Sequence, residues 1–115
     1  LEVELKNETH IDVVTALSGS GIAYLAHIFD TMKSVGVSQG MSEMDAELTV
    51  LETVSGVLAI FDNTELSLND IVKGVVSKGG TTEAGLKTMG VMGLETALKE
   101  GLEDTISKCK DLSDY

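Results

Sequence analysis

Two short segments of this 115-residue chain combine glycine with hydroxyl side chains, and both are candidates for binding chemistry. One of them, at residues 77–82, lies directly before a run of helix-forming residues. At the start of a helix the first backbone N–H groups have no carbonyl partner, and together with hydroxyl donors they can bind a small anion. Because the chain has no arginine, this loop is its best candidate receptor for a carboxylate. The loop consists of Ser77, Lys78, Gly79, Gly80, Thr81 and Thr82.

The charge around this loop favours the same interpretation. Residues 66–92 contain three lysines and two acidic residues, a balance of +1, in a chain whose formal net charge is −11. The remaining residues therefore carry −12. A corner of this composition between two helices also occurs for purely structural reasons, so the residue types alone leave both interpretations open.

The other segment, Ser18, Gly19 and Ser20, does not fit a dinucleotide-binding fingerprint, although Gly21 follows it. Tyr24 stands where GxGxxG requires its third glycine, and the segment follows a predicted helix instead of a strand. We therefore do not assign cofactor phosphates to this segment.

We assign no other catalytic pattern to the sequence. Neither histidine has a carboxylate or cysteine at a ligand spacing such as HExxH, so we expect no metal site. The serines lie in predicted turns and caps, where serine is ordinary, so we assign no serine nucleophile. The single cysteine, Cys109, excludes an internal disulfide, and its place on an apolar helix stripe predicts a buried structural thiol.

The composition favours helices. Hydrophobic residues make up 43% of the chain but aromatic residues only 3%, whereas strands prefer β-branched and aromatic residues. Only residues 1–5 alternate between apolar and acidic side chains, as a strand would. The sequence therefore predicts an all-α fold.

The charge and the hydropathy pattern narrow the classes of partner. A net charge of −11 without arginine would be repelled by phosphate, which disfavours nucleic acid and anionic membranes as partners. The longest uncharged apolar run, about residues 54–61, is far shorter than the ~20 residues of a membrane span. We therefore expect no membrane segment and a cytoplasmic location.

Apolar residues at helical spacing, separated by breaks rich in serine and glycine, predict a series of helices. Ser42 and Ser67 are each followed three residues later by an aspartate, as in a capping box, and Thr81 or Thr82 is expected to cap the next helix. The first short helix is expected to break or bend at residues 18–21. Further helices are expected over about 22–39, 43–62, 68–76, 82–89 and 94–112.

Small residues lie on several of the apolar faces, where they allow another backbone to approach closely. Together with long aliphatic stripes, they indicate that part of the apolar surface is covered by a partner chain, and a homodimer is the natural expectation. These residues are Gly36, Gly56, Gly85 and Gly101.

Three stretches resemble signature sequences of the pyrroline-5-carboxylate reductase family. They are VTALSGSGIAY at 14–24, SKGGTTEAGL at 77–86 and, between them, Gly40-Met41, Ala46 and ETVSG at 52–56, which is similar to the family's GL…A…QTVxG stretch. The register holds without gaps from about residue 12 to residue 112.

The resemblance covers only the C-terminal part of such an enzyme and implies an architecture for it. Residues 12–115 would form an all-helical, multi-helix bundle in an intertwined dimer or higher oligomer, similar to the C-terminal domain of 6-phosphogluconate dehydrogenase. Residues 1–11 would join it to an N-terminal Rossmann domain that binds NAD(P)H. The full-length enzyme would reduce 1-pyrroline-5-carboxylate to L-proline in the last step of proline biosynthesis, and this chain alone would be inactive.

The resemblance also implies roles for the two segments. Ser77, with Lys78 beside it, and the Gly79–Thr82 backbone would bind the substrate carboxylate. The Thr82 hydroxyl would help to hold it and pass a proton to the ring nitrogen. Ser18–Ser20 would lie near the nicotinamide.

The sequence departs from the family pattern at two prolines, which are replaced by Ile22 and Lys78. Loss of proline before Gly79 frees an N–H group and adds a cation, which either strengthens carboxylate binding or misplaces it. Two alternatives therefore stay open: a divergent paralogue that acts on another imine or carboxylic acid, and a non-catalytic dimerisation module.

Overall fold

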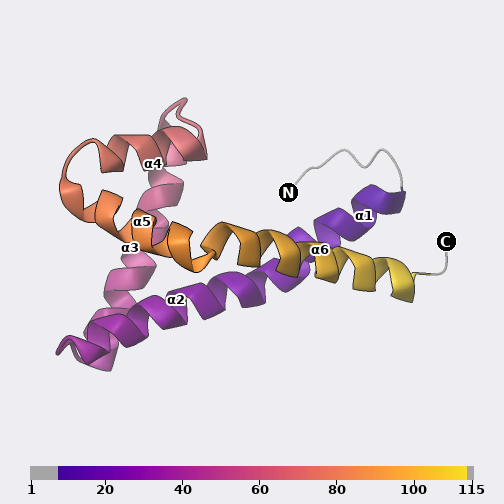
Figure 1. The fold of residues 1–115 in the computed structure, drawn as a ribbon, viewed down its shortest axis with the longest axis horizontal. Coiled ribbons are helices and arrows are strands. Elements are labelled where there is room, and N and C mark those ends of the chain that lie inside the picture. Colours follow the sequence, from indigo (N-terminus) through magenta and orange to yellow (C-terminus); the bar gives the residue numbers. More distant parts are fainter. Residues whose placement is uncertain (1–7, 114–115) are drawn as a thin grey trace. The chain divides into compact units, whose positions relative to one another are not determined.

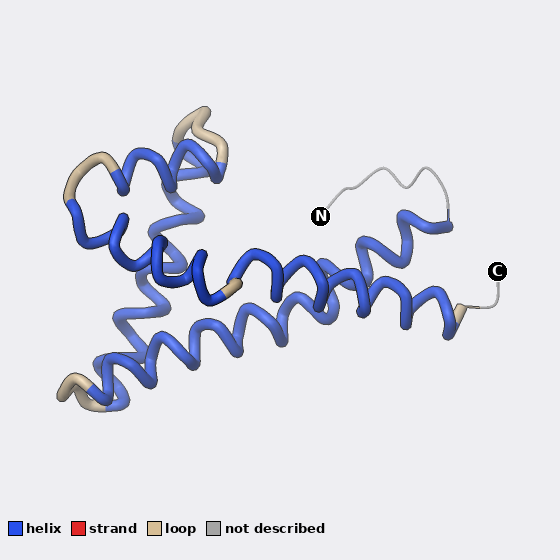
Figure 2. The backbone as a smooth tube through the Cα atoms, viewed as in Figure 1, coloured by secondary structure: helices blue, strands red, loops and turns tan. Residues whose placement is uncertain are grey.

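The computed structural model describes residues 8–113, and all regular structure within them is helical (Figures 1 and 2), which confirms the predicted fold class. The strand suggested for residues 1–5 lies outside the described residues. The elements in chain order are α1 (Glu8–Thr15), η1 (Ala16–Ser20), α2 (Gly21–Ser38), α3 (Glu43–Asn63), α4 (Leu68–Val76), α5 (Gly80–Met92) and α6 (Leu94–Leu112).

Serine side chains begin two of the helices, as the sequence predicts. Ser42 precedes α3, and its hydroxyl accepts a hydrogen bond from the Asp45 N–H at 3.1 Å. Ser67 and Asp70 form a reciprocal capping box at the start of α4. The Ser67 hydroxyl accepts from the Asp70 N–H and the Asp70 carboxylate accepts from the Ser67 N–H, both at 3.0 Å. Each bond satisfies a backbone or side-chain group that the helix itself leaves unpaired.

Of the break or bend expected at residues 18–21, the break is wrong, because the chain stays helical there. Ala16–Ser20 forms a π-helical turn, η1, between α1 and α2, and the Gly21 N–H donates to the Ala16 carbonyl five residues earlier. A turn closed in this way contains one residue more than an α-helical turn, so serine and glycine are accommodated without ending the helix.

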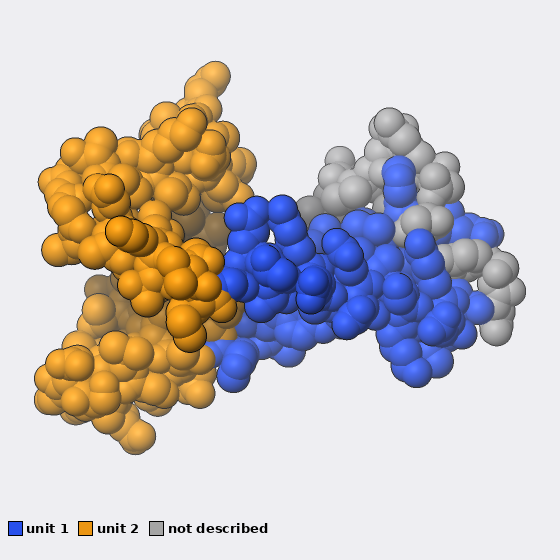
Figure 3. All heavy atoms as spheres, in the orientation of Figure 1, with its two compact units in different colours: residues 1–27, 93–115 blue, residues 28–92 orange. Residues whose placement is uncertain are grey.

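The chain divides into two compact units (Figure 3). The described part of unit 1 comprises residues 8–27 and 93–113, where α1 and η1 pack against α6. Unit 2 comprises residues 28–92, where α4 packs against α3 and α5. Gly93, at the boundary, adopts a left-handed φ of 89° before α6, a conformation that favours glycine.

Within the single chain few apolar side chains are removed from solvent. The buried hydrophobic residues among those described are Ala16, Ala46 and Val50. Gly36 permits close packing of α2 on α3, as predicted, because a Cβ there would lie only 3.2 Å from the Ala46 Cβ. Large side chains on every helix remain exposed. Examples from α3, α4 and α5 are Leu51, Leu58, Val72, Val75, Leu86 and Met89.

One continuous helical stretch, His10–Ser38, is long and apolar enough by length and composition to cross a membrane, and only 17% of the window that meets this test is buried. The longest uncharged run therefore missed this stretch, because isolated charges do not prevent a longer window from being apolar on average. A core helix of a soluble protein meets the same criterion, so the finding is weak evidence for a membrane span.

Candidate functional site

The loop predicted to bind a carboxylate begins where α4 ends. The Ser77 N–H donates to the Lys73 carbonyl at 3.1 Å, and the Lys78 N–H donates to the Val75 carbonyl at 3.2 Å. The Ser77 hydroxyl donates to the Gly74 carbonyl at 3.0 Å. Ser77 therefore uses its hydroxyl proton to close the helix, so the structure does not present that proton to a ligand.

The rest of the loop forms the start of α5. This helix begins at Gly80, so Thr81 and Thr82 lie in its first turn and do not cap it, which corrects the sequence prediction. Glycine needs no side-chain cap here, since the first N–H groups of a helix stay available to solvent or to a ligand. A Cβ at Gly79 or at Gly80 would meet no atom within 4 Å, so the approach to these N–H groups is open.

The electrostatics of this helix start favour an anion. The first-turn N–H groups of α5 lie at the positive end of its dipole, and Lys78 is exposed two residues before the helix. Glu83 in the first turn already benefits from the same dipole. Thr82 is half-buried whereas Thr81 is exposed, so Thr82 is the threonine less accessible to water. The arrangement can bind a small carboxylate and offer it one shielded hydroxyl.

The serine–glycine segment forms most of the π turn in unit 1. Ser18 and Gly19 are exposed, Ser20 is half-buried, and a Cβ at Gly19 would meet no atom within 4 Å. The Ser18 hydroxyl donates to the Val14 carbonyl at 2.6 Å, which leaves its oxygen as an acceptor. π turns inside α-helices are frequent at functional sites. The geometry therefore offers an open polar surface of serine and backbone.

Two polar contacts that sequence reasoning missed link this region to α6. The Tyr24 hydroxyl lies 2.5 Å from the Thr105 hydroxyl oxygen, and the Ser113 hydroxyl donates to the Asp12 carboxylate at 3.1 Å. These partners are 81 and 101 positions apart in the sequence. No local sequence signal identifies such pairs, although Tyr24 was already visible as the residue that breaks the GxGxxG pattern.

The two predicted segments belong to different units, Ser18–Ser20 to unit 1 and the Ser77–Thr82 loop to unit 2. Among the described residues no group of three or more histidine, cysteine or acidic side chains is placed to hold a metal ion. Cys109 is half-buried, not buried as predicted, because so little of this single chain forms a closed core.

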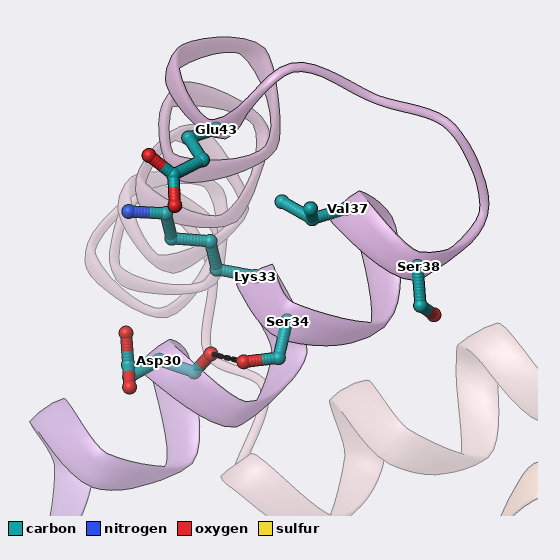
Figure 4. A pocket seen from close by; sticks show the side chains of 6 residues that line it. All are labelled: Asp30, Lys33, Ser34, Val37, Ser38 and Glu43. Atoms are coloured by element: carbon teal, nitrogen blue, oxygen red, sulfur yellow. Dashed lines mark hydrogen bonds between the residues drawn. The ribbon is translucent and has the colours of Figure 1, made fainter.

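One surface hollow, of about 430 Å³, lies where α2 ends and α3 begins, and it contains none of the predicted site residues (Figure 4). Its polar groups are largely engaged within the chain. The Ser34 hydroxyl donates to the Asp30 carbonyl at 3.0 Å (Figure 4), and Lys33 forms an ion pair with Glu47 at 3.5 Å. The hollow thus offers few free donors to a ligand. Its lining residues are Asp30, Lys33, Ser34, Val37, Ser38 and Glu43.

Comparisons with known proteins cover nearly the whole chain. Residues 8–112 match the family model described as pyrroline-5-carboxylate reductase dimerisation. The chain is 31% identical over 107 residues to a pyrroline-5-carboxylate reductase of Staphylococcus haemolyticus, a match that covers 93% of this chain and 40% of the relative.

Solved structures are similar as well. A 1-pyrroline-5-carboxylate reductase of Streptococcus pyogenes matches 96% of this chain and 42% of its own, with a TM-score of 0.88 and 30% identity. The Plasmodium falciparum pyrroline carboxylate reductase with NADP bound matches 91% of this chain and 40% of its own, with a TM-score of 0.86 and 26% identity. The chain therefore spans about 40% of the length of these relatives.

Proposed function

The chain belongs to the pyrroline-5-carboxylate reductase dimerisation family, and on this basis we propose that it is the substrate-binding and dimerisation part of a reductase. The resemblance noted in the sequence is confirmed at the level of the family. The reaction we assign to the full-length protein is hydride transfer from NAD(P)H to the C=N bond of 1-pyrroline-5-carboxylate, which yields L-proline. We place it in the cytoplasm, as the last step of proline biosynthesis.

The observation that carries this proposal is the open start of α5 with a half-buried Thr82 in its first turn. The N–H groups of Gly80, Thr81 and Thr82 bind the substrate carboxylate, helped by the helix dipole. The Thr82 hydroxyl donates a hydrogen bond to the ring nitrogen, which gains a proton as the C=N bond is reduced. Lys78 adds a positive charge beside the same carboxylate.

NAD(P)H, when bound, supplies the hydride. The described residues fit contact with a nicotinamide ring but not the binding of the cofactor's phosphates. Ser18 and Gly19 present an open polar surface, yet the chain has no Gly-rich fingerprint, and residues 8–113 contain no strand to support one. We therefore assign the phosphates to a Rossmann domain outside this chain, and only the wall beside the nicotinamide to Ser18–Ser20.

A homodimer is part of the proposal. Unit 2 leaves large apolar side chains of α3, α4 and α5 exposed, among them Leu58, Val72 and Met89. Gly56, in the middle of α3, has no atom within 4 Å of the Cβ position, so its own chain leaves room there for another. A second copy with the same faces would bury these residues in an isologous interface.

The experiment that tests the activity is an assay of NAD(P)H oxidation by the full-length gene product with 1-pyrroline-5-carboxylate. Turnover supports the proposal, and no turnover in conditions where an authentic reductase works would overturn it. Running NADH and NADPH in parallel assigns the preferred cofactor.

The second candidate, a non-catalytic dimerisation module or a paralogue with another substrate, is favoured by one observation, the exposed Lys78. In the full-length protein, Lys78→Gln removes the charge but keeps the N–H that bonds to Val75, whereas Lys78→Pro removes both. A reductase that uses the cation shows a higher KM for the substrate in both variants. In a paralogue in which Lys78 misplaces the substrate carboxylate, Lys78→Pro gains activity with 1-pyrroline-5-carboxylate. In a non-catalytic dimerisation module it gains none.

A further inference from the structure

We propose that α6 positions the serine–glycine π turn through two polar contacts that flank it, and that Tyr24 is the main positioning residue for Ser18–Ser20. The hydrogen bonds stand without the proposed function, and only their kinetic consequence rests on it. The sequence signatures give no role to Tyr24 or to Asp12.

The two contacts lie on either side of the π turn. Asp12 is four residues before Ala16 and contacts Ser113, and Tyr24 is four residues after Ser20 and contacts Thr105. Between them Ala16, the first residue of the turn, is completely buried, and η1 packs against α6. The turn is therefore held against α6 by the packing of η1, in which Ala16 is buried, and on both flanks by side-chain hydrogen bonds.

The π turn itself places both flanking side chains toward α6. Asp12 and Tyr24 are twelve positions apart, and twelve α-helical residues at about 100° each would leave them about 120° out of line. The π turn absorbs one residue, so the remaining eleven steps bring the two side chains to within about 20° of one face. This is why one straight partner helix can reach both.

The direction of the Tyr24 contact is fixed by its neighbour. The Thr105 hydroxyl donates its own proton to the Gly101 carbonyl at 2.9 Å. Thr105 can therefore only accept from Tyr24, so the phenol proton is held toward α6. A tyrosine whose proton is engaged in this way acts as a tether and is not free to protonate a substrate.

The second contact supports the first from the other side. Asp12 is 4% exposed, and one of its carboxylate oxygens accepts from Ser113, while the other has no hydrogen-bond partner. A buried carboxylate with so few partners depends strongly on each one. The single Ser113 hydroxyl proton is shared between this carboxylate at 3.1 Å and the Cys109 carbonyl at 2.8 Å, so Asp12 holds the weaker of two contacts at the end of α6.

Amide hydrogen exchange of the full-length protein tests the hydrogen-bonded tether. Tyr24→Phe and Thr105→Val each remove the same hydrogen bond, and each is expected to speed exchange of the Ser18–Gly21 amides by about fivefold, the effect of one hydrogen bond. The double variant is expected to show no more than either single variant. Ser34→Ala is the matched control, since its hydroxyl bonds only within α2, and it should leave these amides unchanged.

Three outcomes would overturn the inference: unchanged exchange at Ser18–Gly21 in both single variants, additive effects in the double variant, or equally faster exchange throughout residues 28–92. If Tyr24→Phe fails to fold, Thr105→Val still tests the inference, because it breaks the same bond at a side chain that is only half-buried. The kinetic arm expects a KM for NAD(P)H raised by about fivefold with the KM for 1-pyrroline-5-carboxylate unchanged. A full-length protein without any turnover would remove the proposed function but leave the exchange result standing.

Discussion

The two candidate segments are held in place by opposite means. The π turn Ala16–Ser20 is fixed from far away in the sequence, by contacts of Asp12 and Tyr24 with α6. The Ser77–Thr82 loop is fixed from nearby, by bonds that reach back no more than four residues and by the capping box that begins α4.

Each segment is therefore vulnerable to a different kind of change. The π turn depends on α6 staying packed within its own unit, so distant substitutions can loosen it. The Ser77–Thr82 loop depends on short-range bonds in helices whose apolar faces are left uncovered, so its environment is completed by whatever covers them. In the proposed dimer a second copy covers these apolar faces, so the surroundings of the loop depend on dimerisation.

The strongest effect is expected at Thr82, whose hydroxyl belongs to the locally held loop. Thr82→Val keeps the shape but removes the hydroxyl, and we expect kcat of the full-length enzyme with 1-pyrroline-5-carboxylate to fall by about 100-fold. Thr82→Ser, which keeps the hydroxyl, is the control and should retain most activity. Equal losses in both variants would show that packing, not the hydroxyl, matters at this position.

The next largest effect is expected on dimerisation, at the apolar surface of unit 2 that a second copy would cover. A Cβ at Gly56 would meet no atom of its own chain within 4 Å, so we expect Gly56→Leu to clash mainly with a second copy. Overpacking of about 1–3 kcal/mol predicts dimerisation weakened by about fivefold to 150-fold, measured by sedimentation. Gly74→Ala, also unobstructed but on exposed α4, is the control and should stabilise its helix slightly. Dimerisation unchanged in Gly56→Leu would place the interface elsewhere.

A smaller effect separates the two segments directly. Ser67→Ala removes the cap of α4 and should lower the free energy of unfolding by about 1 kcal/mol. Because α4 leads into the loop, amide exchange at residues 77–82 should become faster while residues 18–21 stay unchanged. Faster exchange at both segments would mean that the units do not respond independently.

The pH dependence of the same cap follows from Asp70. Its bond from the Ser67 backbone N–H, reinforced by the Ser67 hydroxyl, holds the pKa of Asp70 below its ordinary value of 3.8. A lowered pKa stabilises the fold above the ordinary value, and this stability is lost as the pH falls through the lowered pKa. We expect α4 to lose stability below about pH 4, measured by circular dichroism, and Asp70→Asn to abolish that part of the acid transition.

The weakest effect is expected in unit 1, at the Glu95–Lys99 ion pair on the exposed face of α6. Their contact of 2.8 Å lowers the pKa of Glu95 and raises that of Lys99, but solvent screens the pair. Lys99→Gln should leave the melting temperature and both segments unchanged. A shift beyond about 2 °C would show that α6 is more sensitive to its surface charges than its packing suggests.

The elements that close locally were predictable from the sequence. The all-α fold, the starts of α3 and α4, and the last helix from Leu94 to Leu112 follow from apolar spacing and from Ser42 and Ser67, because a cap and its partner lie within one turn. The Ser77–Thr82 loop between two helices was located for the same reason, although the start of α5 was not, since Gly80 begins it without a side-chain cap.

Features that depend on distant partners were not predictable. The Ser18–Gly21 stretch is typical of a break, yet the helix continues through it as a π turn that packs against α6 and buries Ala16. The Tyr24–Thr105 bond joins residues 81 positions apart and has no local signal. Cys109 lies on an apolar stripe as expected, but a single chain with so few buried residues does not close around it.

The extra residue in the π turn also matters at the level of the gene. A wider turn takes up a single inserted codon locally, so the helical faces before and after it keep their partners. Deleting one codon within Ala16–Ser20 would return an ordinary α-helix, with Asp12 and Tyr24 still facing α6 and the serine–glycine bulge gone. The candidate nicotinamide wall can thus be gained or lost in one mutational event without redesign of the scaffold around it.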